Sequence, residues 1–140
     1  MSETYTVSLD SIIDEFQLEK IYYPEKTEPI LIDRKEVNRP GLQLAGFFDH
    51  FDALRIQIVG KVEYHYLLGL SPEERKNAID GFMSKRIAAL IVTSGLDVFE
   101  EFCTAAKQYE TPVLRTQDTT SNFMGGLIAS LNVSLADRMT

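Results

Sequence analysis

The sequence predicts an α/β fold, a Rossmann-like three-layer sandwich in which helices cover both faces of a mostly parallel sheet. In the second half of the chain, β-branched or apolar runs alternate with stretches of helical spacing. Such alternation implies right-handed crossovers between parallel strands. The run at 88–92 is apolar without interruption, which is typical of a strand buried on both faces.

The first half of the chain predicts one short helix, a loop and a brief strand. Ser8 precedes apolar residues that recur at helical period as far as Phe16, so Ser8 is the expected N-cap. Residues 22–29 are polar and contain two prolines, which predicts a loop before an apolar strand at 30–32. In Arg39-Pro40-Gly41, proline fixes φ and glycine tolerates positive φ, so a turn is expected there.

The second half begins with a β-branched, alternating run at 55–59, which predicts a strand. Ser71-Pro72-Glu73-Glu74 has every part of a capped helix start, and the helix should continue to about Phe82. The later elements are a strand at 88–92, a helix at 97–109, a strand at 112–114 and a helix at 123–131. The strand at 88–92 is expected to end in a turn at Thr93-Ser94-Gly95. Gly125-Gly126 weakens the last helix by up to ~1 kcal/mol per glycine relative to alanine.

Composition limits the classes of function. The chain has 140 residues, of which 44% are hydrophobic and 25% charged, as expected of one domain with a packed core. Lys plus Arg number 14 and Asp plus Glu 21, which gives a net charge of −7. An acidic surface repels phosphate backbones and anionic headgroups, so neither nucleic acid nor a membrane is an expected partner. A single cysteine and the absence of a signal-like N-terminus indicate a cytoplasmic protein.

The histidines, the cysteine and the acidic pairs, which are residue types common in catalytic and metal sites, can each be explained by a structural role in this sequence. His50 and His65 have no His or Cys at ligand spacing, so no metal site is predicted. Cys103 lies on the apolar stripe of its helix, which favours a core position over a nucleophilic role. Acidic pairs such as Glu100-Glu101 fall in first turns of helices, where they complement the helix dipole. With no acid–base or nucleophile constellation, catalysis by this chain is not expected.

One set of residues does suggest a ligand. Each member follows a predicted strand, and ligands of open parallel sheets bind outside the carboxyl ends of the strands. The set consists of Lys61, Thr93, Ser94, Gly95, Arg115 and Thr116. Cations and hydroxyls gathered on one edge would bind an anion, with the helix that begins near Asp97 adding N–H donors. The alternative is that the hydroxyls cap helices and the cations pair with neighbouring acids.

From Arg39 onward the chain resembles the N-terminal domain of HPr kinase/phosphorylase, the bacterial enzyme that phosphorylates and dephosphorylates a serine of the phosphocarrier HPr. The matching blocks occur in family order with similar spacing: RPGLQLAGFF at 39–48, RIQIVGK at 55–61, LSPEER at 70–75, IVTSGL at 91–96 and PVLRT at 112–116. The resemblance implies a fold similar to the first domain of Mur ligases. It also implies a structural role for Arg39, Pro40, Gly41 and Gly46, which belong to the family motif.

The resemblance further implies a C-terminal kinase domain, with a P-loop that uses ATP or pyrophosphate and Mg²⁺, which this sequence does not contain. A P-loop needs G-x-x-x-x-G-K-[ST]. Gly41 and Gly46 have the glycine spacing, but Phe47 and Phe48 stand where Lys and a hydroxyl are needed. No cofactor is therefore expected in this chain. Residues 1–140 would form one N-terminal domain, with a linker to the kinase starting within 130–140. The chain is then an excised domain, which we favour, or a stand-alone relative.

The sequence thus predicts a non-catalytic regulatory or assembly domain of an HPr kinase/phosphorylase involved in carbon catabolite regulation. Its expected partners are its own kinase domain and further copies of itself in an oligomer, with HPr implied by the resemblance alone. The alternative is a stand-alone module that recognises a phosphorylated metabolite or nucleotide at the strand ends. An independent small enzyme is the least favoured interpretation, because no catalytic constellation is present.

Overall fold

The computed structural model describes residues 5–136, in which a five-stranded sheet has the order β2-β7-β6-β5-β4. A separate two-stranded sheet pairs β1 with β3. The strands are β1 (Val7–Ser8), β2 (Glu19–Tyr22), β3 (Leu31–Ile32), β4 (Val37–Asn38), β5 (Ile56–Val59), β6 (Ala89–Val92) and β7 (Val113–Arg115). The helices are α1 (Leu9–Phe16), α2 (Gly41–Leu44), α3 (Lys61–Leu68), α4 (Pro72–Met83), α5 (Glu100–Tyr109) and α6 (Thr120–Ser134).

The sheet is parallel from β4 to β7. The sequence predicted parallel strands at β5, β6 and β7, but it did not predict β4. Ile56 lies opposite Ala89, and Leu90 lies opposite Val113, with α5 connecting β6 to β7. The edge strand β2 was not predicted. It pairs antiparallel to β7 and places Glu19 opposite Arg115.

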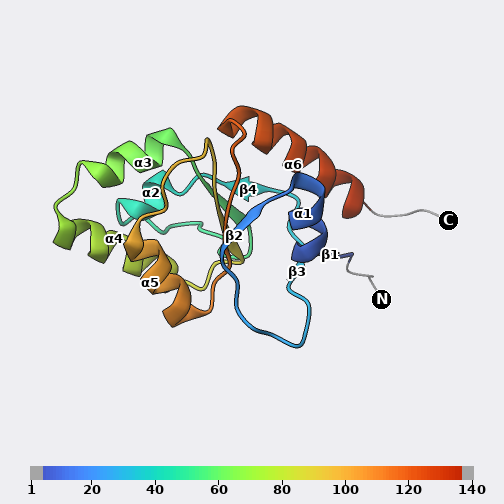
Figure 1. Ribbon diagram of the computed structural model, residues 1–140, viewed down its shortest axis with the longest axis horizontal. Coiled ribbons are helices and arrows are strands. Elements are labelled where there is room, and N and C mark those ends of the chain that lie inside the picture. Colours follow the sequence, from blue (N-terminus) through green and yellow to red (C-terminus); the bar gives the residue numbers. More distant parts are fainter. Residues whose placement is uncertain (1–4, 137–140) are drawn as a thin grey trace.

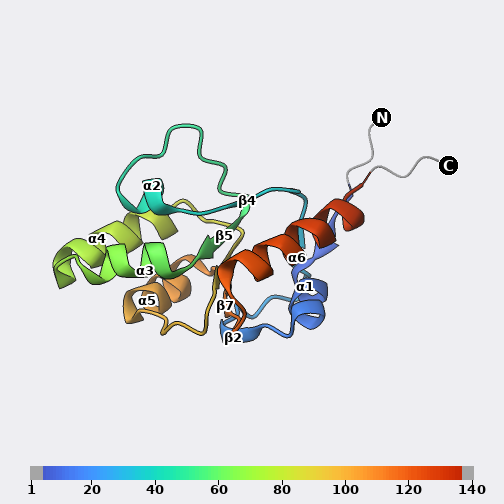
Figure 2. The same ribbon diagram turned by 90° about the horizontal axis from the view of Figure 1, so that it is seen from above.

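Helices cover both faces of the sheet, which confirms the predicted three-layer α/β fold (Figures 1 and 2). Alternate strand residues point to opposite faces, so each strand contributes to two cores. Ile58 and Ile91 pack with α1 and α6, whereas Val59 and Leu90 pack with α2, α4 and α5. The central strands are buried on both faces, as the uninterrupted apolar run at 88–92 predicted.

Helix starts agree closely with the predicted caps. The Ser8 hydroxyl accepts a hydrogen bond from the Ser11 N–H at 3.1 Å. Ser71 and Glu74 form the predicted capping box, in which the Glu74 N–H donates to Ser71 Oγ at 3.2 Å and the Ser71 N–H to Glu74 Oε1 at 3.1 Å. Helix α5 begins at Glu100, three residues later than Asp97, and its N-cap residue Phe99 has non-helical backbone angles (φ −56°, ψ 140°).

The turn predicted at Pro40-Gly41 is instead the start of α2, and the glycine with positive φ is Gly46, at 101°. The helix ends in a Schellman motif: the Phe47 N–H donates to the Leu42 carbonyl at 2.9 Å, and the Gly46 N–H donates to the Gln43 carbonyl at 3.0 Å. This motif needs a left-handed residue after the helix, which glycine supplies without steric cost.

The two glycines of α6 occupy different surroundings. A Cβ on Gly125 would meet nothing within 4 Å, whereas one on Gly126 would lie 3.2 Å from Phe16 Cε1. The Phe16 ring packs edge-on against Phe123, with ring centroids 5.4 Å apart. Gly126 therefore makes room for α1 to pack on α6. Helix α6 extends through Ser134, into the expected linker at 130–140, whose residues 137–140 lie outside the described residues.

Helix α3 and Cys103 differ from the sequence-based expectations. Helix α3 was not predicted; it buries only Glu63 and Leu67 and so lacks an apolar stripe. Cys103 is half-buried rather than in the core, because its neighbour Phe102 takes the inward position. Among the described helices, none is both long and apolar enough to cross a membrane.

Candidate functional site at the carboxyl ends of the strands

The residues that follow β6 form hydrogen bonds with neighbouring segments of the chain. Thr93 is buried, and its hydroxyl lies 2.6 Å from that of Thr120. Ser94 and Gly95 both have left-handed backbone conformations, with φ of 60° and 61°. The Ser94 N–H donates to the Asp118 carbonyl at 2.7 Å, and the Gly95 N–H donates to the Thr116 carbonyl at 2.9 Å. The two amides thus join this loop to the one after β7 instead of facing an open site.

Arg115 is held by a carboxylate of the edge strand. Its Nε and Nη2 donate to the two carboxylate oxygens of Glu19, each at 3.0 Å, and its Nη1 donates to the Leu96 carbonyl at 3.2 Å. This is the bidentate geometry that arginine and carboxylate prefer. Thr116 is also engaged, because its hydroxyl accepts the Asp118 N–H at 3.2 Å. The pairing of cations with neighbouring acids, which was the alternative to an anion site, is therefore present at Arg115.

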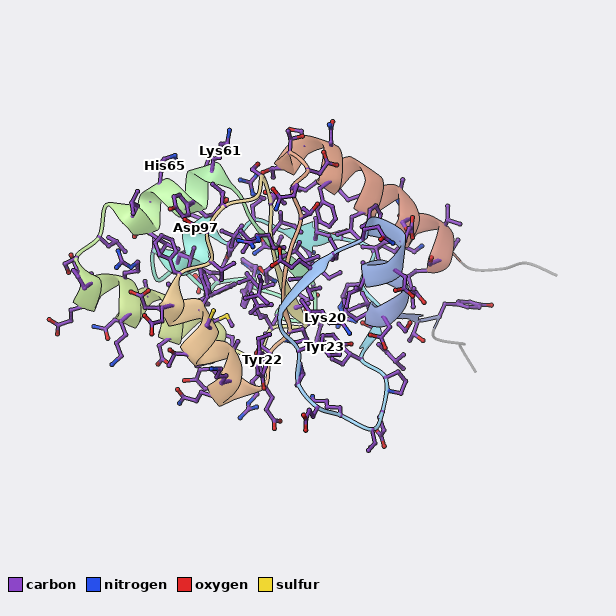
Figure 3. All side chains as sticks on the ribbon, in the orientation of Figure 1. Lys20, Tyr22, Tyr23, Lys61, His65 and Asp97 are labelled. Carbon is purple, nitrogen blue, oxygen red and sulfur yellow. The ribbon has the colours of Figure 1, made fainter. Side chains whose placement is uncertain are left out.

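Lys61 is separated from this group. It is the exposed first residue of α3, and its side chain points away from the sheet (Figure 3). Asp97 is exposed on the loop between β6 and α5. The structure thus brings Thr93, Ser94, Gly95, Arg115 and Thr116 together at one edge and leaves Lys61 outside the group. The predicted anion site remains a prediction.

Sequence reasoning missed an ion pair between a buried carboxylate and a half-buried arginine next to this edge. Glu63 is only 4% exposed, and its Oε1 accepts hydrogen bonds from Arg39 Nη2 at 2.7 Å and from the Gly60 N–H at 2.8 Å. Arg39 Nε is buried with no hydrogen-bond partner among the described residues. The available signal was the three-residue spacing of Gly60 and Glu63, which is that of a capping box. The ion pair joins the family motif to the first turn of α3.

Gly60 allows α6 to approach this edge closely. A Cβ at Gly60 would lie 2.5 Å from Thr120 Oγ1 and 3.0 Å from Arg39 Nη2. The first contact is shorter than Cβ atoms normally make, so a side chain at Gly60 would force the Thr120 hydroxyl to move. The N-termini of α3 and α6 thereby come together over the buried Thr93.

Ion pairs and hydrogen bonds connect the side chains around the strand ends to one another. At the strand ends, the carboxylates of Glu63 and Glu19 are each paired with an arginine, and the Thr93 hydroxyl is hydrogen bonded. Within residues 5–136, no three His, Cys, Asp or Glu side chains gather closely enough to hold a metal ion.

A groove of about 620 Å³ lies elsewhere, between α4 and α5. Arg75 crosses it, stacked over the Phe99 ring at 5.1 Å and bonded to Glu101 at 2.8 Å. Burial is the largest single influence on the Glu101 pKa and raises it, but the hydrogen bond from Arg75, a backbone hydrogen bond and the Arg75 charge together outweigh burial, so the pKa lies below its usual value. The groove shares no residue with the strand-end group, and the protein's own ion pair crosses it.

Fold and site together define a small three-layer α/β domain of the Rossmann-like class, whose strand-end residues largely bond to one another. The particular family follows from comparison with known proteins. Residues 7–131 match the family model described as "HPr Serine kinase N terminus". The chain belongs to this family, which confirms the resemblance seen in the sequence.

Curated relatives named HPr kinase/phosphorylase extend this match. The protein of Caldicellulosiruptor bescii is 39% identical over 136 residues, covering 97% of this chain and 44% of the relative. That of Clostridium perfringens strain 13 is 39% identical over 133 residues, covering 95% of this chain and 41% of the relative. The chain therefore spans less than half the length of these relatives.

The fold also occurs in a solved structure. The CBS and DRTGG domains of the regulatory region of Clostridium perfringens pyrophosphatase, complexed with the activator diadenosine tetraphosphate, align with a TM-score of 0.61. The match has 20% sequence identity and covers 93% of this chain and 50% of that chain. At this identity the likeness shows a common fold.

Proposed function

We propose that this chain is a non-catalytic N-terminal module of an HPr kinase/phosphorylase, with a regulatory or assembly role in carbon catabolite regulation. The observation that carries the proposal is the match of residues 7–131 to the N-terminal part of the family, while the curated relatives are more than twice as long. The kinase chemistry of the relatives would then belong to a part of the protein other than this module.

The residues of the chain support a role without catalysis. The sequence contains no G-x-x-x-x-G-K-[ST] segment to hold a triphosphate and Mg²⁺. The two glycines with that spacing instead lie at the ends of the short helix α2: Gly41 is its first residue, and Gly46 lies two residues beyond its last residue, Leu44. ATP, pyrophosphate and Mg²⁺ are therefore assigned to the kinase part, and HPr is a partner of the whole enzyme.

The experiment is a domain exchange with a relative. Residues 7–131 replace the matching N-terminal part of the Caldicellulosiruptor bescii protein, and the chimera is compared with that intact protein and with its isolated kinase part. We expect the chimera to resemble the intact protein in oligomeric state and in its rate of HPr phosphorylation. A chimera that behaves like the isolated kinase part would contradict the proposal, as would an isolated kinase part indistinguishable from the intact protein.

A further inference from the structure

The groove between α4 and α5 is large enough to hold a small molecule. The two helices lie side by side on one face of the sheet (Figure 1), and the groove of about 620 Å³ lies between them. Small-molecule sites commonly enclose about 300–1,000 Å³. The lining combines charged side chains with apolar ones, which include the Phe99 ring and the buried Ala105. The proposed function makes no use of this groove.

Arg75 on α4 is fixed in the groove but keeps hydrogen-bond donors free. Its Nε donates to Glu101 Oε2 at 2.8 Å, and its guanidinium lies 5.1 Å above the Phe99 ring, which also stacks on Tyr64. Neither Nη of Arg75 has a hydrogen-bond partner among the described residues. In that part of the chain, Arg39 Nε is the one fully buried side-chain nitrogen without a partner. Both Nη atoms of Arg75 are therefore open to solvent and available to a ligand in the groove.

This presentation of Arg75 is suited to a carboxylate. The two Nη atoms of a guanidinium form a planar fork that matches the two oxygens of a carboxylate. Because Glu101 and Phe99 already hold the side chain, a ligand would immobilise little more of it. Lys76 lines the same groove as a second cation. A phosphate dianion is disfavoured, because the carboxylates of Glu100 and Glu101 also line the groove and would repel its second negative charge.

The remaining charges of the groove favour a ligand that also carries an ammonium group. Three carboxylates line the groove against two cations. Two of these carboxylates are engaged, because Glu101 accepts from Arg75 and Asp80 accepts from the Tyr109 hydroxyl at 2.9 Å. Glu100 is exposed, and its carboxylate has no cation paired with it among the described residues. A ligand with a carboxylate alone would add to the excess of negative charge, whereas an ammonium group beside Glu100 would offset it.

We propose that the groove between α4 and α5 binds an α-amino acid with an apolar side chain. The carboxylate of the ligand lies on the Nη fork of Arg75, its ammonium group lies near Glu100, and its side chain packs against Phe99 and Ala105. The inference goes beyond the proposed function, because it assigns a small-molecule site to this chain itself. Its test needs neither HPr nor a kinase part.

Titrations of the chain followed by NMR chemical shifts test the site with leucine as the probe. We expect a dissociation constant of about 1 mM or lower, with the shifted amides on α4 and α5. Leucinamide lacks the carboxylate and 4-methylpentanoate lacks the amine, so each should bind about ten-fold more weakly than leucine. A chain that leucine leaves unperturbed up to about 10 mM, or that binds inorganic phosphate more tightly than leucine, would overturn the proposal.

Two variants test the two ends of the ligand separately. Arg75→Gln should weaken leucine binding about ten-fold and leave leucinamide binding unchanged, because the lost contact is to a carboxylate. Glu100→Gln should weaken leucine binding and leave 4-methylpentanoate binding unchanged, because the lost contact is to the amine. Glu100 is exposed, so this second variant tests the site even if Arg75→Gln does not fold.

Arg34→Gln is the matched control for the arginine variant. Arg34 also donates through Nε to a carboxylate, that of Asp52 at 2.9 Å, but it lies outside the groove. Its substitution should leave leucine binding unchanged. Circular dichroism of each variant establishes whether the chain is folded. Leucine binding that a folded Arg75→Gln chain or a folded Glu100→Gln chain retains at full strength would contradict the proposal.

Discussion

The two adjacent glycines of α6 give the sharpest test of the packing between α1 and α6. Alanine at an exposed helix interior is more stabilising than glycine by about 0.5–1 kcal/mol, because glycine loses more backbone freedom on folding. At Gly125 the added methyl meets nothing within 4 Å. Gly125→Ala should therefore raise the free energy of unfolding by nearly the full amount.

Gly126→Ala brings the same gain in helix propensity but adds a methyl 3.2 Å from Phe16 Cε1. The Phe16 ring must shift by a few tenths of an ångström against Phe123, and overpacking of this kind costs on the order of 1 kcal/mol. The gain and the cost cancel or leave a net loss. The two variants should thus differ in unfolding free energy by roughly 1 kcal/mol.

Urea unfolding followed by circular dichroism measures the difference. Gly125→Ala should also raise the melting temperature by about 3 °C. In a Phe16→Ala background the obstruction is gone, so Gly126→Ala should become as stabilising as Gly125→Ala, and this coupling is a double-mutant cycle. Equal stabilisation by the two alanines in the wild-type background would refute the reasoning.

Three further predictions concern the strand ends and the N-terminal loop. Gly60→Ala should lower the free energy of unfolding by about 1–3 kcal/mol, because its Cβ would lie 2.5 Å from Thr120 Oγ1. Adding Thr120→Ala to the Gly60→Ala chain should restore part of the lost free energy, as measured by urea titration. Burial, and then the hydrogen bond to Asp10, raise the pKa of Tyr23 from 10.0 to about 12. The unfolded state ionises first, so this contribution to stability is complete below pH 10 and is lost as the pH rises toward 12; Tyr23→Phe should flatten that part of the stability profile. If the predicted anion site exists, calorimetric titration should detect binding of phosphate, pyrophosphate, sugar phosphates or uridine nucleotides, and Arg115→Ala should weaken that binding. If the wild-type chain gives no binding heat with any of these ligands, the Arg115–Glu19 pair has a structural role alone.

The sequence predicts those elements whose burial is regular. Strands β5 and β6 are buried on both faces, and α1 and α4 carry complete N-cap signals, so composition and spacing were sufficient to find them. Strand β2 was missed because its charged Glu19 and Lys20 are exposed at the sheet edge. Its position depends on antiparallel pairing with β7, which no local pattern contains.

Helix α3 was missed for a related physical reason. Its buried positions hold a glutamate and a leucine, while Val62, Tyr66 and Leu68 are exposed, so the periodicity that identifies amphipathic helices is absent. The candidate site could likewise be predicted only in part. Parallel topology correctly grouped the residues after β6 and β7, but whether Arg115 pairs with a carboxylate depended on the unpredicted strand β2 that carries Glu19.

Phosphoryl transfer tests most directly the proposal that this chain is the non-catalytic N-terminal module of its family. The purified chain is incubated with HPr, Mg²⁺ and γ-labelled ATP, beside the intact Caldicellulosiruptor bescii protein as the positive control. We expect labelled HPr with the intact protein and none with this chain, which also should not bind ATP specifically in calorimetry. Transfer of the γ-phosphate to HPr by this chain alone would contradict the proposal.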